Sequence, residues 1–109
     1  MKKPESHLSK TKLRAMIEEA TMDAYGESAE ATGWFTMIDE NLKLPFEAQV
    51  LGLPAAVERM DINQHDEIVA VCRRGKYRQT IPILDLHLPS PPPAGAEWIE
   101  AYRRWSSGR

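Results

Sequence analysis

The sequence predicts an α+β fold, with two N-terminal helices, a small and strongly curved antiparallel sheet, and a short C-terminal helix. The first observation is the period of the apolar residues, which is three to four in residues 11–43 and two from residue 46 onward. The second is the segregated order of helices, strands and helix, which argues against an alternating α/β fold. The third is the close spacing of turn residues in 46–88, which favours a meander of the SH3-like barrel type.

Two helices are expected within residues 11–43. Apolar residues recur three and four positions apart up to Gly26, which is a typical residue for a helix end. A second apolar stripe begins near Glu27 and ends by Lys43. Pro45 then biases the residue before it toward extended geometry, so the helical part of the chain is expected to stop there.

Four strands are expected in residues 46–88, because apolar and polar residues alternate there between short polar or glycine-containing turns. The third strand is apolar on both faces and is therefore predicted to be central. The predicted strands are 46–50, 55–62, 68–73 and 77–83. A proline-rich connector at 89–96 and a helix at 97–106 follow, and the aromatic face of that helix is expected to dock on the sheet.

Length and composition point to one domain over residues 1–109, in which the basic residues 1–10 are expected to be frayed. No run of about 18 apolar residues is present, so no membrane-spanning segment and no membrane partner are expected. The single cysteine, Cys72, cannot form a disulfide within the chain, which suits a reducing cytoplasm. It lies in the most apolar strand, where a buried thiol is the expected role.

Charge is distributed unevenly along the chain. Residues 15–67 contain twelve acidic and two basic side chains, a net charge of −10, whereas residues 1–14 and 68–109 each carry +4. A segment with this charge attracts cations and repels phosphate groups. The alternative for each single acid is a solvated helix face.

Asp39 and Glu40 are adjacent acids at the predicted end of the second helix. Hard cations prefer several oxygen ligands from carboxylates and carbonyls, and a helix C-terminus supplies unsatisfied backbone carbonyls and the negative end of its dipole. These two residues are therefore candidate metal ligands. The alternative is a solvated helix end.

A second acidic segment, residues 61–67, begins like an EF-hand loop but does not continue as one. Asp66 occupies the sixth place, where glycine is needed for the sharp turn, and Cys72 occupies the twelfth, where glutamate is needed. Asp61, Asp66 or Glu67 could still contribute to an irregular cation site. The alternative is a hydrophilic hairpin turn.

Catalytic chemistry has little support in this sequence. The three histidines, at positions 7, 65 and 87, are scattered, and no nucleophile-histidine arrangement or phosphate-binding glycine loop is present. We therefore expect no enzyme and no catalytic residue. A basic hairpin at Arg73–Arg78 keeps one other class open, a small-barrel module that binds nucleic acid or a protein segment.

Several motifs together resemble the small bacterial calcium-binding protein family first described in cyanobacteria. They span roughly residues 32–105 and agree with that family in their order. The motifs are residues 34–42, 44–46, 48–52, 68–75 and 81–86, and the proline-rich stretch before Trp98-Ile99-Glu100-Ala101-Tyr102.

The resemblance implies Ca²⁺ binding by acidic residues without an EF-hand. It matches the acidic pair of the aromatic helix to Asp39 and Glu40, and it adds Asp85 as a candidate from the end of the strand motif. The expected function is therefore that of a cytoplasmic Ca²⁺ buffer or sensor, with a divalent cation as the main partner and room for an unknown protein partner. Nucleic-acid binding is the less favoured alternative.

Overall fold

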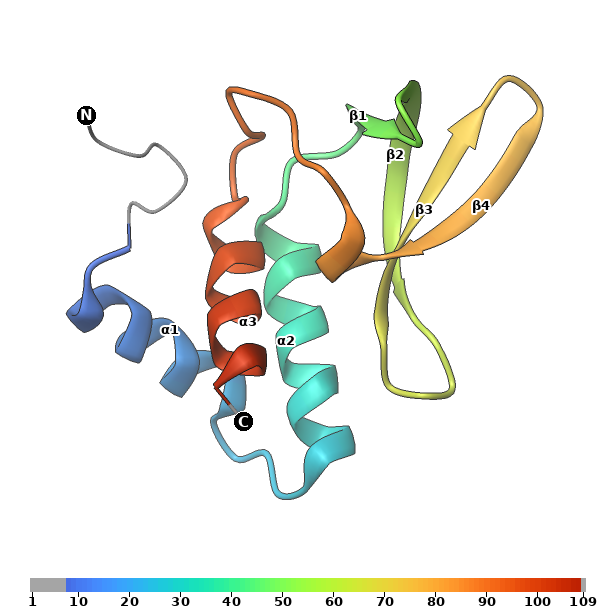
Figure 1. Ribbon diagram of the computed structural model, residues 1–109. Coiled ribbons are helices and arrows are strands. Elements are labelled where there is room, and N and C mark those ends of the chain that lie inside the picture. The colour runs from blue at the N-terminus through green and yellow to red at the C-terminus, as the bar shows by residue number, and fades with distance from the viewer. Residues whose placement is uncertain (1–7, 109) are drawn as a thin grey trace.

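A computed structural model describes residues 8–108 (Figure 1). In chain order it has two helices, four strands, a short 3-10 helix and a final helix. This order confirms the predicted α+β class. The elements are α1 (Lys10–Thr21), α2 (Glu27–Asn41), β1 (Phe46–Val50), β2 (Leu53–Ile62), β3 (Ile68–Arg74), β4 (Tyr77–Pro82), η1 (Ile83–Asp85) and α3 (Glu97–Ser107). The expected fraying of residues 1–10 falls mostly on residues 1–7, outside the described part, and Lys10 already belongs to α1.

The helix starts follow local rules of the chain. Ser9 caps α1, because its side-chain oxygen accepts a hydrogen bond of 3.0 Å from the Lys12 amide. Gly26 precedes α2 with a φ of +103°, a conformation that glycine adopts readily. Within residues 8–108 we find no helix with the length and apolar character needed to cross a lipid bilayer.

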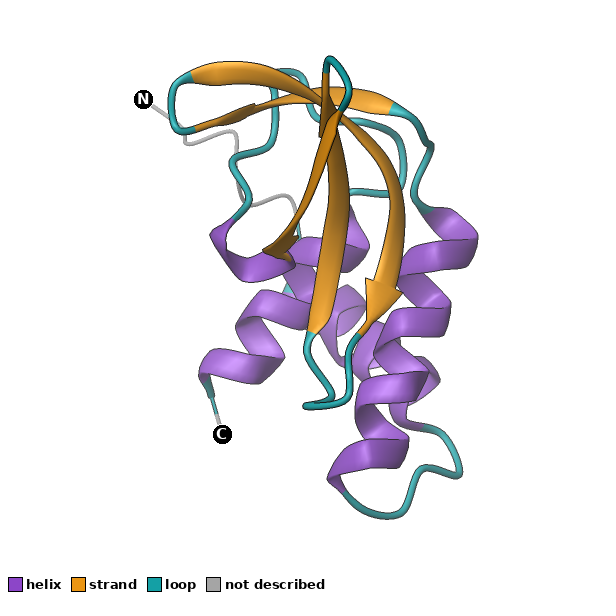
Figure 2. Ribbon diagram, turned by 90° about the vertical axis from the view of Figure 1, so that its right-hand side faces the viewer, coloured by secondary structure: helices purple, strands orange, loops and turns teal. Residues whose placement is uncertain are grey.

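The four strands form one antiparallel sheet in the order β1-β2-β3-β4. β3 is central and its first five residues are buried, as predicted from its apolar faces. The pairing of β2 with β3 shifts between Val57 and Arg59, so Glu58 is the extra residue of a bulge. Bulges increase local twist, and the sheet is strongly twisted in Figure 2.

The predicted barrel is wrong, because the sheet remains open. Barrel closure would require the chain after β4 to pair along β1. β4 instead ends at Pro82, which has no N–H to donate, and η1 then turns the chain away. The returning segment meets β1 at a single isolated bridge between Gln49 and His87.

The three helices lie on one side of the sheet (Figures 1 and 2). Trp34 of α2 is completely buried at their centre. Its ring centroid lies 5.4 Å from that of Trp105 and 5.6 Å from that of Tyr102, both on α3. The aromatic face of α3 therefore packs on α2, and not mainly on the sheet as expected from the sequence.

The proline-rich connector is held against the end of α2. The Lys43 amide donates a hydrogen bond of 2.9 Å to the Ala94 carbonyl. Gly95 follows with a φ of +88°, and a Cβ on it would lie 2.0 Å from the Asn41 carbonyl oxygen. Only glycine allows this approach, which fixes the surroundings of the acidic end of α2.

Candidate functional site

Asp39 and Glu40 lie exposed in the last turn of α2. Neither takes part in an ion pair or side-chain hydrogen bond with another residue of the described chain. Acids at a helix C-terminus face the negative end of the dipole, so a cation there would be stabilising. Consecutive helix positions point about 100° apart, so the two carboxylates could share an ion only beyond the helix end.

The backbone at this helix end is partly engaged. The Ile38 carbonyl accepts a hydrogen bond of 2.9 Å from the Leu42 amide. The Met37 carbonyl accepts one of 2.7 Å from the side-chain nitrogen of Asn41. These two carbonyl oxygens are therefore engaged, and the backbone ligands closest to Asp39 and Glu40 would be the carbonyl oxygens of the final residues of α2.

Asn63 organises the second acidic segment, a role that the sequence did not reveal. Its side-chain oxygen accepts hydrogen bonds from the amides of His65, at 2.8 Å, and Glu67, at 3.0 Å. Its side-chain nitrogen donates to a carboxylate oxygen of Glu67 at 3.0 Å. The segment is therefore a tight asparagine-centred turn, as its polar composition predicted.

The three candidate acids of this turn each have a partner in the protein. The Asp61 carboxylate accepts hydrogen bonds from the Ile62 amide, at 2.8 Å, and from Arg59, at 3.3 Å. Asp66 has a φ of +62° and accepts a hydrogen bond of 3.2 Å from the Ser28 hydroxyl. A cation here would have to replace these contacts as well as water.

The structure places the two acidic groups at opposite ends of α2. Asp66 contacts Ser28 in the first turn, whereas Asp39 lies eleven residues further along the helix. A rise of about 1.5 Å per residue separates these positions by about 16 Å. Two ligands of one Ca²⁺ ion lie within about 5 Å of each other, so the turn and the helix end are separate places.

Asp85 lies elsewhere again, at the end of η1. It lines a surface hollow of about 1090 Å³ together with Glu97 and Glu100 of α3. Arg103 also lines this hollow and donates a hydrogen bond of 2.9 Å to the Leu84 carbonyl. The packing of α3 beside η1 brings Glu97 and Glu100 to the same hollow, which the sequence did not reveal. Glu100 already forms ion pairs of 3.9 Å with Arg103 and Arg104.

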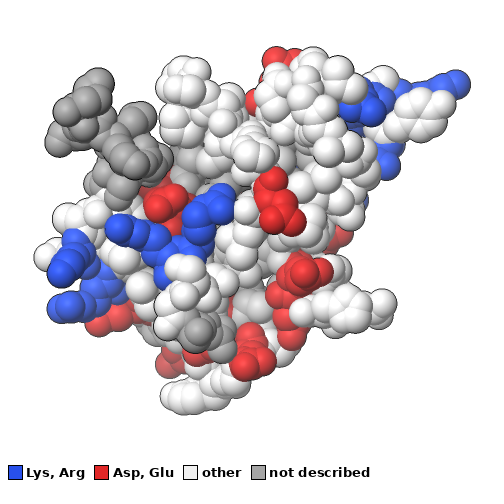
Figure 3. Space-filling view, viewed as in Figure 1, with Lys and Arg blue, Asp and Glu red and all other residues white. Residues whose placement is uncertain are grey.

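In the part of the chain that the structure describes, no three side chains of the His, Cys, Asp and Glu types are grouped closely enough to hold a metal ion. On the face that Figure 3 shows, acidic side chains are scattered from the upper edge to the lower part of the surface, and basic ones form two groups. The basic groups lie at the left, over the first and last helices, and at the upper right, at the tip of the β3–β4 hairpin.

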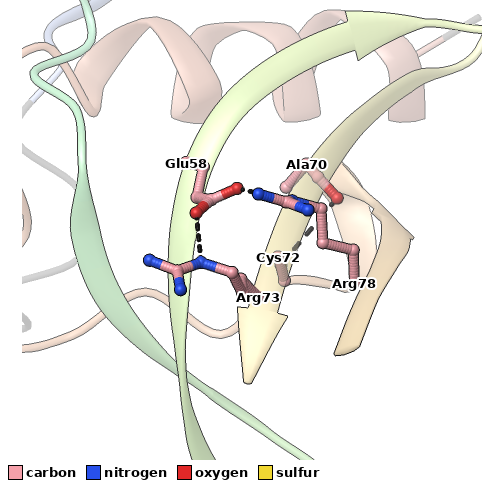
Figure 4. Close-up of polar contacts among 5 residues, drawn as sticks. All are labelled: Glu58, Ala70, Cys72, Arg73 and Arg78. Atoms are coloured by element: carbon pink, nitrogen blue, oxygen red, sulfur yellow. Dashed lines mark hydrogen bonds and ion pairs between the residues drawn. The ribbon is translucent and has the colours of Figure 1, made fainter. Parts of the chain in front are cut away.

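The basic hairpin has an acidic partner that the sequence prediction also missed. Figure 4 shows the Glu58 carboxylate between Arg73 and Arg78, with an ion pair to each. The Arg78 contact measures 3.0 Å. Hydrogen bonds from Arg78 first, and then from Arg73, hold the pKa of Glu58 below its ordinary value of 4.5. Two of the hairpin's four cations are thus engaged within the sheet.

Cys72 is buried in β3, as expected. Its thiol points to the Ala70 carbonyl at 3.8 Å, also visible in Figure 4. Burial raises the pKa of this thiol, so the protonated form is favoured further. A buried thiol of this kind is typical of core packing.

Comparisons with known proteins agree with the resemblance noted in the sequence. A crystal structure of CcbP from Anabaena has the same fold, with a TM-score of 0.73 over 93% of each chain and 17% sequence identity. The search of curated proteins produced no match. Residues 14–106 match a family model that is named for CcbP and described as calcium binding. Because this match covers most of the chain, the protein belongs to the CcbP family of calcium-binding proteins.

Proposed function

We propose that this protein binds Ca²⁺ reversibly through surface carboxylates and acts as a cytoplasmic Ca²⁺ buffer or sensor. The observation that carries the proposal is the family match over residues 14–106. The excess of acids in residues 15–67 supports it, because that charge raises the local concentration of divalent cations. A cytoplasmic location suits the buried free thiol of Cys72.

The end of α2 is the best-supported of the candidate places. Asp39 and Glu40 are exposed there, without a protein partner among the described residues, and they face the negative end of the helix dipole. Binding a cation would offset the unfavourable interaction of both carboxylates with the helix dipole. At the 61–67 turn, by contrast, an ion would first have to displace existing hydrogen bonds.

The coordination at this place would be incomplete without water. Ca²⁺ takes six to eight oxygens, and two carboxylates with one or two terminal carbonyls of α2 supply about three to six of them. Water completes the shell. Such a site is open and discriminates weakly by size. Mg²⁺ would therefore be disfavoured mainly because it loses its bound water reluctantly.

The place of binding can be tested by calorimetric titration with Ca²⁺ and with Mg²⁺. We expect a Ca²⁺ isotherm for the wild-type chain, and at least about tenfold weaker binding for the Asp39→Asn, Glu40→Gln double variant, because two charged ligands are lost. The matched control is the Asp61→Asn, Glu67→Gln double variant, which also removes two acids but leaves the helix end intact. Its affinity should change less than threefold, roughly the effect of surface charge alone.

Three outcomes would separate the possibilities. A Ca²⁺ isotherm that is unchanged in the Asp39, Glu40 variant but lost in the control would move the site to the 61–67 turn. An isotherm retained in both variants would move the site to Asp85 and its neighbours at the hollow. No heat from the wild-type chain at millimolar Ca²⁺ would reject the proposed function itself.

A further inference from the structure

Three of the five large apolar side chains that are exposed within residues 8–108 lie at one end of the sheet. Leu51 is 92% exposed, Leu53 50% and Tyr77 72%. The start of β2 pairs with the end of β3, so the β1–β2 turn and the β3–β4 turn project from the same end, uppermost in Figure 1. We call this region, residues 50–54 and 73–78, the turn end.

Leu51 occupies a conformation that leucine rarely adopts. Val50 pairs with Leu53, so Leu51 and Gly52 form a two-residue turn, and their φ angles are +53° and +79°. Positive φ at both positions is the pattern of a type I′ turn, in which asparagine, aspartate and glycine are preferred. A leucine here strains the backbone and places a large apolar side chain in water, and neither feature stabilises the fold. An outlier of this kind points to a role outside the chain.

The turn end also carries positive charge. Residues 73–78 contain four bases and no acid. Arg73 and Arg78 pair with Glu58, whereas Arg74 and Lys76 have no ion pair with any other residue between 8 and 108. Basic side chains cover this tip in Figure 3. With Glu47 and Glu58 of the adjoining strands counted, the net charge of this end is still +2.

We propose that the turn end docks on an anionic lipid surface. Leu51, Leu53 and Tyr77 enter the boundary between headgroups and acyl chains, and Arg74 and Lys76 face the phosphate and carboxylate groups of the lipids. Exposed apolar side chains at the same end of the sheet as two bases without an ion pair are complementary to such a surface. The sequence-based expectation of no membrane partner rests on the lack of a spanning segment, which peripheral docking does not need.

The shape of the turn end favours lipid over two other partners. Leu51 stands on a projecting turn, Leu53 and Tyr77 begin the strands that follow the two turns, and a lipid surface can close around such a projection. A stable protein interface buries about 800 Å² on each side, which calls for a broader complementary surface. Single-stranded nucleic acid is bound by stacking on aromatic rings, which would use Tyr77 but leave the two leucines without a role.

The proposal can be tested by co-sedimentation of the full chain with vesicles of phosphatidylcholine, alone and mixed with phosphatidylserine. A calcium chelator is present throughout, so the outcome does not depend on the proposed calcium site. We expect binding only to the mixed vesicles, weakening as salt is added. Leu51→Asn should weaken binding by about tenfold, because the variant loses the leucine side chain that enters the lipid. Lys76→Gln should weaken it by about fivefold.

The control for the leucine is Met22→Asn, since Met22 is 67% exposed but lies between α1 and α2, away from the turn end. Its binding should equal that of the wild type. Asparagine suits the Leu51 turn, so Leu51→Asn should melt no lower than the wild type, which excludes unfolding as the cause of lost binding. Equal binding by Leu51→Asn and the wild type overturns the proposal. Failure of the wild-type chain to bind the mixed vesicles also overturns it. Binding of an oligonucleotide, or dimerisation, through the same residues would then identify the partner of the turn end.

Discussion

At the scale of single residues, Gly95 decides how closely the connector approaches the acidic end of α2. Its φ is +88°, and a Cβ would lie 2.0 Å from the Asn41 carbonyl oxygen, a backbone atom that cannot easily move. We therefore expect Gly95→Ala to lower the free energy of unfolding by about 3 kcal/mol, measured by urea denaturation. Gly52→Ala is the matched control, because Gly52 has a φ of +79° but open space around its Cβ position. It should lose only about 1 kcal/mol, and equal losses would show that the close approach carries no cost.

Residue types in the sequence locate the acids of the candidate site but not their neighbours. Asp66 was found from its place in a polar turn, whereas its contact with Ser28 joins residues 38 positions apart. Glu58 went unnoticed because its role depends on the bulge that turns it toward two arginines of the hairpin. The first contact joins a turn to a helix and the second depends on a bulge, and residue types along one sequence reveal neither arrangement.

At the scale of the elements, apolar periodicity predicted the three α-helices and the four strands, but not η1, whose first residue was expected to end the fourth strand. α1 also ends at Thr21, earlier than the expected stop at Gly26. The first predicted strand, 46–50, has the bounds of β1. β2 begins two residues earlier than expected, at Leu53, because the turn is made by Leu51 and Gly52 and not by residues 52–54. Propensity alone does not place a leucine at positive φ, so this boundary lay outside what the sequence could predict.

The bulge in β2 gives the sheet a pH-dependent link between three strands. The pKa of Glu58 is lowered in the folded state by hydrogen bonds from Arg78 and Arg73. A lowered folded pKa adds stability above the unfolded value, near 4.5, and this stability is lost as the pH falls through the folded value. We expect Glu58→Gln to be less stable than the wild type at neutral pH, and the difference to shrink as the pH falls below 4.5.

Urea unfolding of both proteins across this range measures that difference directly. Glu47→Gln serves as the control, because it removes the charge of another sheet glutamate that has no ion pair within the described chain. Its effect on stability should vary less with pH. A Glu58 difference that is the same at every pH would show that the two arginines do not stabilise the ionised carboxylate.

At the scale of the whole molecule, the open sheet and the split acidic groups have a common cause. Alternation predicts strands but not whether the last one returns to the first, and Pro82 with η1 prevents that return. In the same way, a count of acids in residues 15–67 does not reveal that two groups of them lie at opposite ends of α2, about 16 Å apart. Long-range arrangement, and not element type, was the part that sequence reasoning could not supply.

The arrangement of the core predicts how the whole molecule responds to Ca²⁺. All three tryptophans lie in one cluster, with the ring centroid of Trp34 6.3 Å from that of Trp98 and 5.4 Å from that of Trp105. The candidate carboxylates are on the surface, so binding need not disturb this cluster. We expect saturating Ca²⁺ to raise the melting temperature, by the equivalent of about 2.7 kcal/mol at a hundred times Kd, and to leave the tryptophan emission maximum unchanged. That combination is the behaviour of a buffer. Unfolding in urea provides the reference shift for an exposed cluster, and a Ca²⁺-induced shift toward that reference would identify a sensor that opens between α2 and α3.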